Sequence, residues 1–236
     1  MQAVILAGGK GTRLKPYTTI LPKPLMPIGD ICILEVIIRQ LKRYGFHRII
    51  LTVGYLAELL EAYFGDGRRF GVDIIYSRED KPLGTAGPLA LIADKLDPVF
   101  LVMNGDILTT LNYNDLLAYH YKRGGIATIA MHAKDIKIDL GVIEINNNDE
   151  VIGYIEKPTM HYMVSMGIYV FDRRVTKYIE FGKRLDFPDL ILRLLAHGEK
   201  VIAYHSHDYW LDIGRPDDYE RAIEEFEQRR KELLGE

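Results

Sequence analysis

The chain has 236 residues, of which 30 are basic and 33 acidic, so its formal net charge is -3. This balance excludes a charge field of one sign, and neither nucleic acid nor a membrane surface is an expected partner. The single cysteine, Cys32, excludes internal disulfides and multi-cysteine zinc motifs. Because no apolar stretch is long enough to span a bilayer, we expect a cytoplasmic protein.

In the first half of the chain, short runs rich in β-branched residues alternate with stretches of helical periodicity. Strands are predicted at residues 3–7, 48–53, 72–76 and 99–103. Helices are predicted at residues 34–44, 55–64 and 85–95. This alternation indicates a parallel α/β sheet with helices on both faces.

After about residue 125 the pattern changes to a mixed, partly antiparallel extension. Strands are predicted at residues 126–131, 142–145, 151–155, 165–171 and 201–204, with helices at 190–195 and 216–234. The last helix is charged, and we expect it to be solvated, with partner binding as the alternative. Since no linker or repeat interrupts the sequence, residues 1–236 are predicted to form one domain, with a nucleotide half (about 1–110) and a second-substrate half (about 111–236).

The first predicted strand runs directly into the glycine-rich stretch LAGGKGTRLKP, residues 6–16. A dinucleotide fingerprint would need glycine where Leu14 stands, and a P-loop would need serine or threonine where Gly11 follows Lys10. Both standard interpretations therefore fail. Glycine amides after a strand still favour anion binding, although a plain glycine turn with surface cations remains the alternative.

Two cations follow these glycines. Arg13 offers a planar, multidentate donor for phosphate oxygens, and Lys23 offers a mobile point charge. The neighbouring prolines Pro22 and Pro24 are expected to hold Lys23 in an extended segment.

LAGGKGTRLKPYT followed by LPKPLMPI resembles the signature of the sugar-1-phosphate nucleotidyltransferases, and the resemblance extends to WLDIG near the end. It implies a three-layer α/β/α sandwich with a Rossmann-like, mostly parallel sheet. It also implies that the loop wraps a triphosphate, that Arg13 stabilises the leaving pyrophosphate and that Lys23 contacts phosphate. Family members that are regulated or bifunctional often carry a C-terminal β-helix. Because the stretch after Asp212 is short, we expect a catalytic domain without one.

The stretch YSREDKPLGTAGPLAL resembles the family's base-recognition loop. Glu79 could accept hydrogens from both N1 and N2 of guanine, which favours GTP, although relatives that use UTP can also carry glutamate here. Gly84 and Gly87 would let a base approach the backbone, and the Thr85 hydroxyl would cap the predicted helix. The predicted nucleotide-binding residues are Leu6, Ala7, Gly8, Gly9, Gly11, Thr12, Arg13, Lys23, Glu79, Pro82, Gly84, Thr85, Asn104 and Asp106.

Two aspartates are candidate metal ligands. Asp106 follows the predicted strand 99–103, at the carboxyl edge where open α/β sheets bind ligands, although it could simply stabilise a turn. Asp212 stands between Leu211 and Ile213, so it should be partly buried and need a partner. Mg²⁺ would serve both carboxylates, and the resemblance implies that both bind it. A zinc site at His205 and His207 is a weaker alternative, since no third ligand is placed.

The stretch IEKPTMHYMVSMGIYVF resembles the family's sugar-phosphate site, with Glu156 on sugar hydroxyls and Lys157 on the sugar phosphate. An ordinary surface ion pair is the alternative for these two residues. Many relatives carry asparagine where this chain has Ser165, which leaves the identity of the sugar open. The predicted sugar-phosphate residues are Asp139, Gly141, Glu156, Lys157, Ser165, Gly167 and Asp212.

The resemblance implies an enzyme in which a sugar 1-phosphate attacks the α-phosphorus of a nucleoside triphosphate, with Arg13, Lys23 and Lys157 as catalytic residues. The best-matching substrates are GTP and mannose 1-phosphate. Alternatives are a heptose-1-phosphate guanylyltransferase, a UTP- or dTTP-dependent enzyme for glucose or an amino sugar, a regulatory nucleotide-sugar-binding relative, and a glycosyltransferase. The sequence leaves open whether the chain forms a homo-oligomer.

Overall fold

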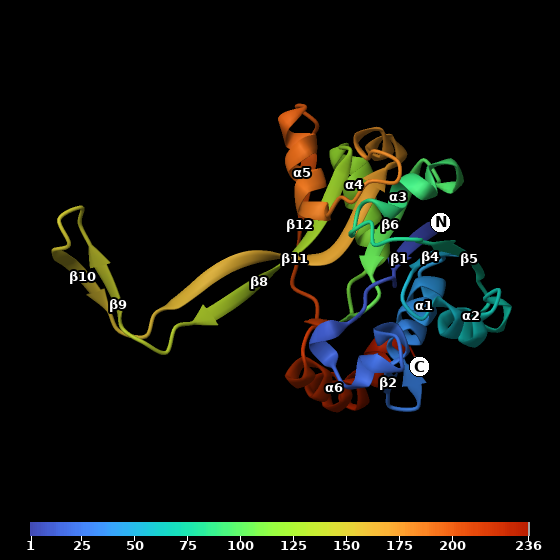
Figure 1. Cartoon of the computed structure of the whole chain (residues 1–236), viewed down its shortest axis with the longest axis horizontal. Helices are drawn as coiled ribbons and strands as arrows, with labels where there is room; N and C mark the ends of the chain where they lie inside the picture. The colour runs from blue at the N-terminus through green and yellow to red at the C-terminus, as the bar shows by residue number, and fades with distance from the viewer. Residues whose placement is uncertain (236) are drawn as a thin grey trace.

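The computed structural model describes residues 1–235 and is built on a seven-stranded sheet of order β12-β8-β11-β6-β1-β4-β5 (Figure 1). All neighbouring strands are parallel except the pairs that β11 forms with β6 and β8. The predicted mostly parallel sheet is therefore confirmed. Its strands are β1 (Gln2–Leu6), β4 (Arg48–Val53), β5 (Asp73–Arg78), β6 (Val99–Asn104), β8 (Ala127–Lys137), β11 (Thr159–Asp172) and β12 (Val201–Ser206).

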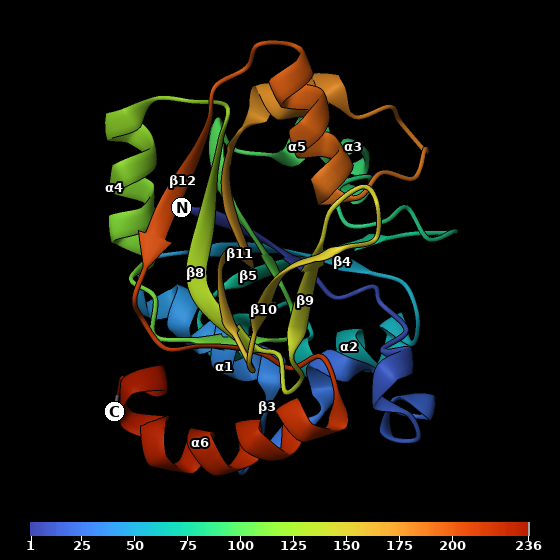
Figure 2. The same cartoon turned by 90° about the vertical axis from the view of Figure 1, so that its left-hand side faces the viewer.

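Helices cover both faces of this sheet, which confirms the three-layer sandwich. One apolar core packs α1 (Ile33–Arg43), α2 (Ala57–Phe64), α4 (Tyr113–Arg123) and α6 (Pro216–Leu234). The other core packs α3 (Pro88–Leu91) and α5 (Phe187–Ala196). Figure 2 shows α4 and α5 on opposite sides of β8, β11 and β12. No helix within residues 1–235 is both long and apolar enough to cross a bilayer.

Two helices differ from the sequence-based expectation. The helix predicted at 85–95 is only the short α3, followed by a 3-10 turn at Ala93–Lys95. Glycines disfavour helix, and Pro88 can occupy only the first turn, so α3 starts three residues late. Helix α4 was not predicted, although Asn112 is a clear start signal because its side chain accepts the amide hydrogens of Asn114 and Asp115.

Strands β8 and β11 continue beyond the sheet as a two-stranded ribbon, which ends in the hairpin of β9 (Val142–Ile145) and β10 (Val151–Ile155). We call residues 136–163 the arm; it projects to the left in Figure 1. The antiparallel extension was expected, but the strands predicted at 126–131 and 165–171 are much shorter than β8 and β11. The register shifts between Ser165 and Tyr169, where Gly167 has a φ of +72°.

Two short ribbons and α6 complete the fold around the carboxyl edge of the sheet. One ribbon pairs β7 (Ile107–Thr109) with β13 (Trp210–Asp212), and the other pairs β2 (Pro27–Ile28) with β3 (Ile31–Cys32). The prediction of a fully solvated last helix is wrong, because Phe226 and Leu233 of α6 are buried in the core. The charged face conceals this apolar stripe, which repeats at helical spacing.

Candidate active site

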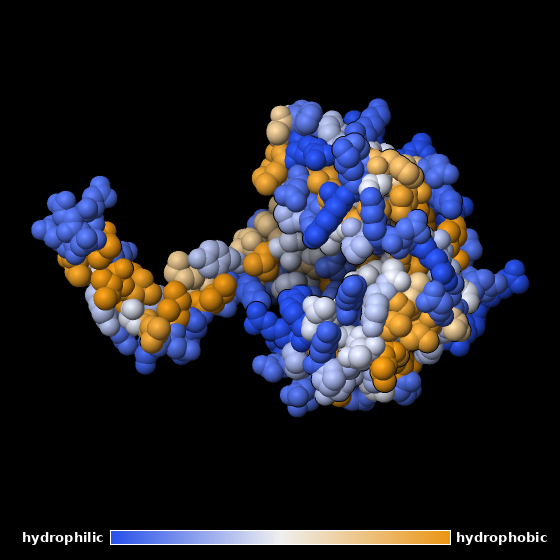
Figure 3. Space-filling model, viewed as in Figure 1, coloured by the Kyte–Doolittle hydropathy of each residue, from blue (hydrophilic) through white to orange (hydrophobic). Residues whose placement is uncertain are grey.

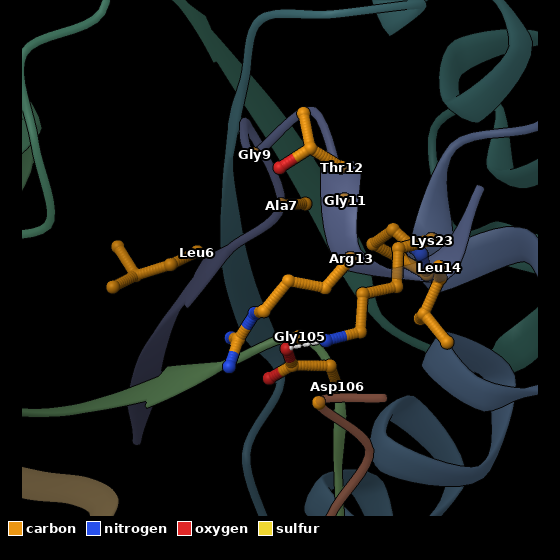
Figure 4. A pocket seen from close by; sticks show the side chains of 12 residues that line it. Leu6, Ala7, Gly9, Gly11, Thr12, Arg13, Leu14, Lys23, Gly105 and Asp106 are labelled. Atoms are coloured by element: carbon orange, nitrogen blue, oxygen red, sulfur yellow. Dashed lines mark hydrogen bonds and ion pairs between the residues drawn. The ribbon is translucent and has the colours of Figure 1, made fainter. Parts of the chain in front are cut away.

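Two adjoining cavities open at the carboxyl ends of β1 and β6, near the glycine-rich loop and Asp106. Figure 4 shows the first of them. Their volumes are about 240 and 320 Å³, which together fall in the range of small-molecule sites. Leu6, Gly9 and Asp106 line both cavities. Every residue of the predicted nucleotide-binding set lines one cavity or the other, so the fold brings this whole set together.

Two glycines of the loop, Gly8 and Gly11, are required by their surroundings, whereas Gly9 has open space at its Cβ position. A Cβ atom on Gly8 would lie 2.9 Å from the Glu79 carboxylate, so this glycine allows the loop to meet Glu79. Gly11 has a φ of +59°, and a Cβ atom there would lie 2.8 Å from the Thr18 side chain. The loop is therefore held tightly between its neighbours, with its backbone facing the cavities.

Lys23 does not lie in the expected extended segment. It begins a 3-10 turn, Lys23–Leu25, and only Pro22 before it is extended. The turn buries Lys23 and points its ammonium at Asp106, with which it forms an ion pair (Figure 4). The other carboxylate oxygen of Asp106, Oδ1, is buried and has no hydrogen-bond partner among the described residues. A buried, unsatisfied carboxylate oxygen is costly unless a ligand completes its contacts.

Asp212 comes close to Asp106 because β13 pairs with β7, placing Asp212 opposite Ile107. Its side chain opens onto the cleft, between the buried residues Leu211 and Ile213. Desolvation by the surrounding protein, followed by the negative charge of Asp106, raises the pKa of Asp212 above its ordinary value, whereas Lys23 and Arg13 lower it. Two close carboxylates with an unsatisfied oxygen fit a hard divalent cation.

Within residues 1–235, no three His, Cys, Asp or Glu side chains form a group that could hold a metal alone. A cation at Asp106 and Asp212 would therefore need substrate or water oxygens, which is how Mg²⁺ usually binds. The sequence-based zinc alternative at His205 and His207 gains no third ligand in the described part of the chain.

Arg13 reaches across Gly214 into the same cleft. A Cβ atom on Gly214 would lie 3.4 Å from Arg13 Nη1 and 3.5 Å from Asp212 Oδ2, so the glycine makes room for both groups. Figure 4 shows Arg13 and Lys23 converging on Asp106 from the loop side. In the described chain the guanidinium has no hydrogen bond or ion pair with another residue, and its donors are available to an anion.

The second cavity is built around Glu79. Its Oε2 accepts the Leu83 amide hydrogen at 2.8 Å, while Oε1 faces Gly8. Burial raises the pKa of Glu79, and the hydrogen bond from Leu83 opposes that shift. Thr52 and Asp186 also line this cavity and were missed by sequence reasoning. Asp186 directly precedes Phe187 and Pro188 at the start of α5, and this helix-start signal could have drawn attention to it.

The proposed role of Thr85 needs correction, and Gly84 and Gly87 also have a structural role. The Thr85 hydroxyl does not cap α3; it accepts the amide hydrogen of Phe187 at 2.8 Å and so supports the start of α5. A Cβ atom on Gly84 would lie 2.5 Å from the Leu185 carbonyl oxygen, and one on Gly87 would lie 2.2 Å from that of Leu83. These glycines are needed for protein packing, which the local sequence could not show.

We expect Gly84→Ala to destabilise the protein by about 2–4 kcal/mol, because a positive φ and a backbone clash act together. Gly84 has a φ of +79° and no space for a Cβ atom. Gly182→Ala is the matched control, since Gly182 has a φ of +69° but no atom within 4 Å of the Cβ position. Urea unfolding of both variants measures the difference; equal losses would contradict the packing argument.

The predicted sugar-phosphate residues are not gathered in one place. Ser165 and Gly167 lie where β11 enters the body, and a Cβ atom on Gly167 would lie 2.6 Å from Asn104 Nδ2. The Ser165 hydroxyl donates to the Tyr169 hydroxyl at 3.0 Å. The four residues of the set that belong to the arm lie away from the body and from Asp212: Asp139, Gly141, Glu156 and Lys157.

The expectation that these four residues share a pocket with Asp212 of the same chain is therefore corrected. None of them lines the two cavities at the carboxyl edge of the sheet. The physical reason is that β8 and β11 keep pairing from Met131 and Ser165 out to Lys137 and Thr159. At roughly 3.3 Å per residue, this pairing carries the hairpin about 20 Å beyond the sheet.

A third cavity of about 540 Å³ lies between the start of the arm and α6, next to the first. Arg13 and Asp212 line it together with Lys134, Arg215 and Arg221. The last three residues were not predicted, because they come from segments that meet only in the folded chain. Asp135, Asp212 and Asp218 line the same cavity and Arg221 is paired with Glu225, so the charge of this cavity is mixed.

An open α/β sheet with a glycine-rich loop, convergent cations and two carboxylates at its carboxyl edge defines a class of nucleotide-binding phosphate-transfer proteins. The chain belongs to the sugar-1-phosphate nucleotidyltransferase family: the family model described as nucleotidyl transferase matches residues 2–229.

The proteins that this chain resembles are named for different substrates. The chain is 36% identical to a UTP--glucose-1-phosphate uridylyltransferase from Synechocystis and 34% identical to a mannose-1-phosphate guanylyltransferase from Mycobacterium tuberculosis, each over 94% of its length. It covers 62% and 63% of those two proteins, respectively.

Solved structures resemble the whole fold. A putative glucose-1-phosphate thymidylyltransferase from Bacillus anthracis matches with a TM-score of 0.76 and 26% identity, covering 95% of this chain and 94% of that one. HddC from Yersinia pseudotuberculosis matches with a TM-score of 0.76 and 27% identity, covering 95% and 99%.

Proposed function

We propose that this protein transfers a nucleotidyl group from a nucleoside triphosphate to a sugar 1-phosphate. A phosphate oxygen of the sugar would attack the α-phosphorus, the bond to the β-phosphate would break, and pyrophosphate would leave. The observation that carries this proposal is the convergence of Arg13, Lys23 and Asp106 on the first cavity. Asp212 lines the adjoining third cavity together with Arg13, and Glu79 lines the second.

The cleft's own residues would mainly neutralise and position two anions. Arg13 and the loop amides would hold the departing pyrophosphate, and Lys23 would contact phosphate while paired with Asp106. No general base is needed, because a sugar phosphate is already ionised near neutral pH. Mg²⁺ held by Asp106, Asp212 and substrate oxygens would supply further positive charge when bound.

We further propose GTP as the nucleotide and mannose 1-phosphate as the sugar. Glu79 supports GTP, because a carboxylate can accept two hydrogens from the guanine edge even while Oε2 holds the Leu83 amide. The similarity to the mannose-1-phosphate guanylyltransferase from Mycobacterium supports both substrates, and the HddC structure complexed with GMP-PN supports the guanine nucleotide alone. The uridylyltransferase and thymidylyltransferase names keep UTP and dTTP as competing candidates.

Glu79→Gln tests the base contact. We expect KM for GTP to rise roughly 10- to 100-fold, since a hydrogen bond to a charged group contributes about 1.5–3 kcal/mol and the amide introduces donors facing donors. ITP, which lacks the 2-amino group, should lose less. Initial rates with both nucleotides measure the change, with Asp80→Asn as the neighbouring carboxylate control. Equal losses for GTP and ITP would remove Glu79 from the guanine edge.

A substrate panel tests the reaction itself. Each nucleoside triphosphate is paired with mannose, heptose, glucose and amino-sugar 1-phosphates, and pyrophosphate release is measured. Fastest turnover with GTP and mannose 1-phosphate is the expected result. Turnover with UTP or dTTP alone would contradict the guanylyl assignment, and nucleotide-sugar binding without turnover would indicate a regulatory relative.

A further inference from the structure

The arm exposes an unusual amount of apolar surface for two strands in water. Figure 3 shows this apolar surface running along its length, with hydrophilic residues at the tip. Eleven large apolar side chains of the arm each expose between 41% and 73% of their surface. They are Ile136, Leu140, Ile143, Ile145, Val151, Ile152, Tyr154, Ile155, Met160, Tyr162 and Met163.

Many of these side chains face one another across the ribbon. Ile143 is paired with Tyr154 and Ile145 with Val151 in the hairpin, so these four side chains share one face. Nearer the body, Ile136 is paired with Met160. An isolated two-stranded ribbon is only marginally stable in water, and an apolar face of this kind marks an interaction surface. Something outside the chain's own body must cover it.

The glycine-rich loop of a second copy has the complementary character. Residues 8–24 contain no acidic side chain and three exposed basic ones, Lys10, Arg13 and Lys15, since Lys23 is buried against Asp106. The arm contains five acidic and two basic side chains. The same loop exposes Ile20 at 80% and Tyr17 at 54%. An acidic, apolar arm therefore matches a basic loop with exposed apolar residues, and each copy carries both surfaces.

The size of the arm also suits such a contact. Eleven half-exposed large side chains amount to roughly 1,000 Å², and a stable interface needs about 800 Å² from each partner. If two copies exchange arms about a two-fold axis, the same contact forms twice. Both arms are then covered, and no apolar face is left exposed for a third copy.

Lys157 links this surface to the cleft. It is held at a φ of +47°, a strained conformation for lysine, and such strain clusters at functional sites. It stands where the ribbon meets the hairpin, beside Glu156, whose carboxylate accepts the Tyr154 hydroxyl at 3.1 Å. The cavities at the chain's own carboxyl edge contain no arm residue, so Lys157 could contribute to such a cleft only in another copy.

We propose that the arm of one copy packs over residues 8–24 of a second copy and places Lys157 at the mouth of that copy's cleft. Each site is then built from two chains, with Lys157 supplying a cation for the sugar phosphate. The role of Lys157 rests on the proposed function, whereas the exchange of arms does not.

Light scattering tests the assembly without any assay of activity. We expect wild type to be a dimer at micromolar concentration, and Ile143→Asp/Ile145→Asp to be a monomer with an unchanged far-ultraviolet circular dichroism spectrum. Ile20→Asp should weaken the dimer from the other side of the contact. Leu192→Asp, which changes an equally exposed leucine on α5, should remain dimeric. A monomeric wild type, or arm variants that stay dimeric, would overturn the exchange.

Mixed dimers test whether the site is shared. Arg13→Ala and Lys157→Ala, each inactive alone, are co-expressed with different tags and purified as a heterodimer. If the arms are exchanged, one of the two sites in this heterodimer combines the intact Arg13 of one chain with the intact Lys157 of the other. About half of the wild-type turnover should then return. The inverse heterodimer, wild type with the double variant, should be inactive under exchange and half active if each arm serves its own chain.

The two experiments fail in different ways. A dimer that depends on the arm but releases no pyrophosphate with any substrate pair would contradict the proposed function and leave the exchange intact. An active inverse heterodimer would contradict the shared site while leaving the reaction intact.

Discussion

Asp212→Asn is expected to lower turnover roughly 10³-fold and, at neutral pH, to make the protein more resistant to unfolding. The loss follows because one of two charged oxygen donors in a phosphate-transfer cleft disappears, and single groups of this kind contribute about 10²–10³-fold. The gain in stability follows from the raised pKa of Asp212, because desolvation and the negative charge of Asp106 destabilise its charged form in the folded protein.

The sign of the pH effect follows from linkage. A carboxyl group whose pKa is higher in the folded state binds protons more tightly there than when unfolded. Its contribution to stability is therefore favourable at low pH and is lost as pH rises through the two pKa values. Asparagine does not ionise, so Asp212→Asn avoids this loss of stability. The variant should therefore be more stable than wild type at pH 7, and this difference should disappear under acid conditions.

Thermal unfolding at several pH values, together with pyrophosphate release, measures both parts of this prediction. Asp94→Asn is the control, because Asp94 is exposed on a 3-10 turn away from the cleft. It should change neither turnover nor the pH dependence of unfolding. Full activity of Asp212→Asn would exclude Asp212 from the site, and a uniform loss of stability would contradict the raised pKa.

Arg13→Ala is expected to reduce kcat roughly 10²–10³-fold, with a smaller change in KM for the triphosphate. The guanidinium is free to bind an anion and converges on Asp106, so its contribution should be largest when charge develops on the leaving pyrophosphate. Arg13→Lys should recover only part of the rate, because an ammonium cannot reproduce planar, multidentate donation.

The reverse reaction gives a sharper readout for Arg13, since pyrophosphate is then the substrate. We expect its KM to rise more in Arg13→Ala than KM for the nucleotide sugar. Arg68→Ala is the arginine control, because Arg68 is highly exposed and paired only with Asp66 on a distant turn. Equal effects on both reverse substrates would place Arg13 away from the pyrophosphate.

The nucleotide side of the cleft was largely predictable because its signals are local. Gly8, Gly9 and Gly11 follow a β-branched strand directly, and Asp106 follows another, so parallel strands bring them to one edge. Lys23 could also be found from a local signal, because it follows the glycine-rich loop closely in the sequence. Its 3-10 turn was not predicted. Thr52 and Asp186 were missed because tertiary contacts place them in the cavity: β4 pairs Thr52 with Leu6, and Asp186 accepts the Thr85 amide hydrogen.

The class of sheet, the position of the glycine-rich loop and the charged residues around it were predictable from local sequence, because periodicity and glycine placement act over a few residues. The tertiary structure decided which of those residues meet. Asp212 joins Asp106 only through the pairing of β13 with β7. Lys157 and Glu156 leave the cleft because β8 and β11 keep pairing beyond the sheet. Apolar alternation indicates that a strand face will be covered, but what covers it depends on contacts between segments far apart in the chain, or between chains.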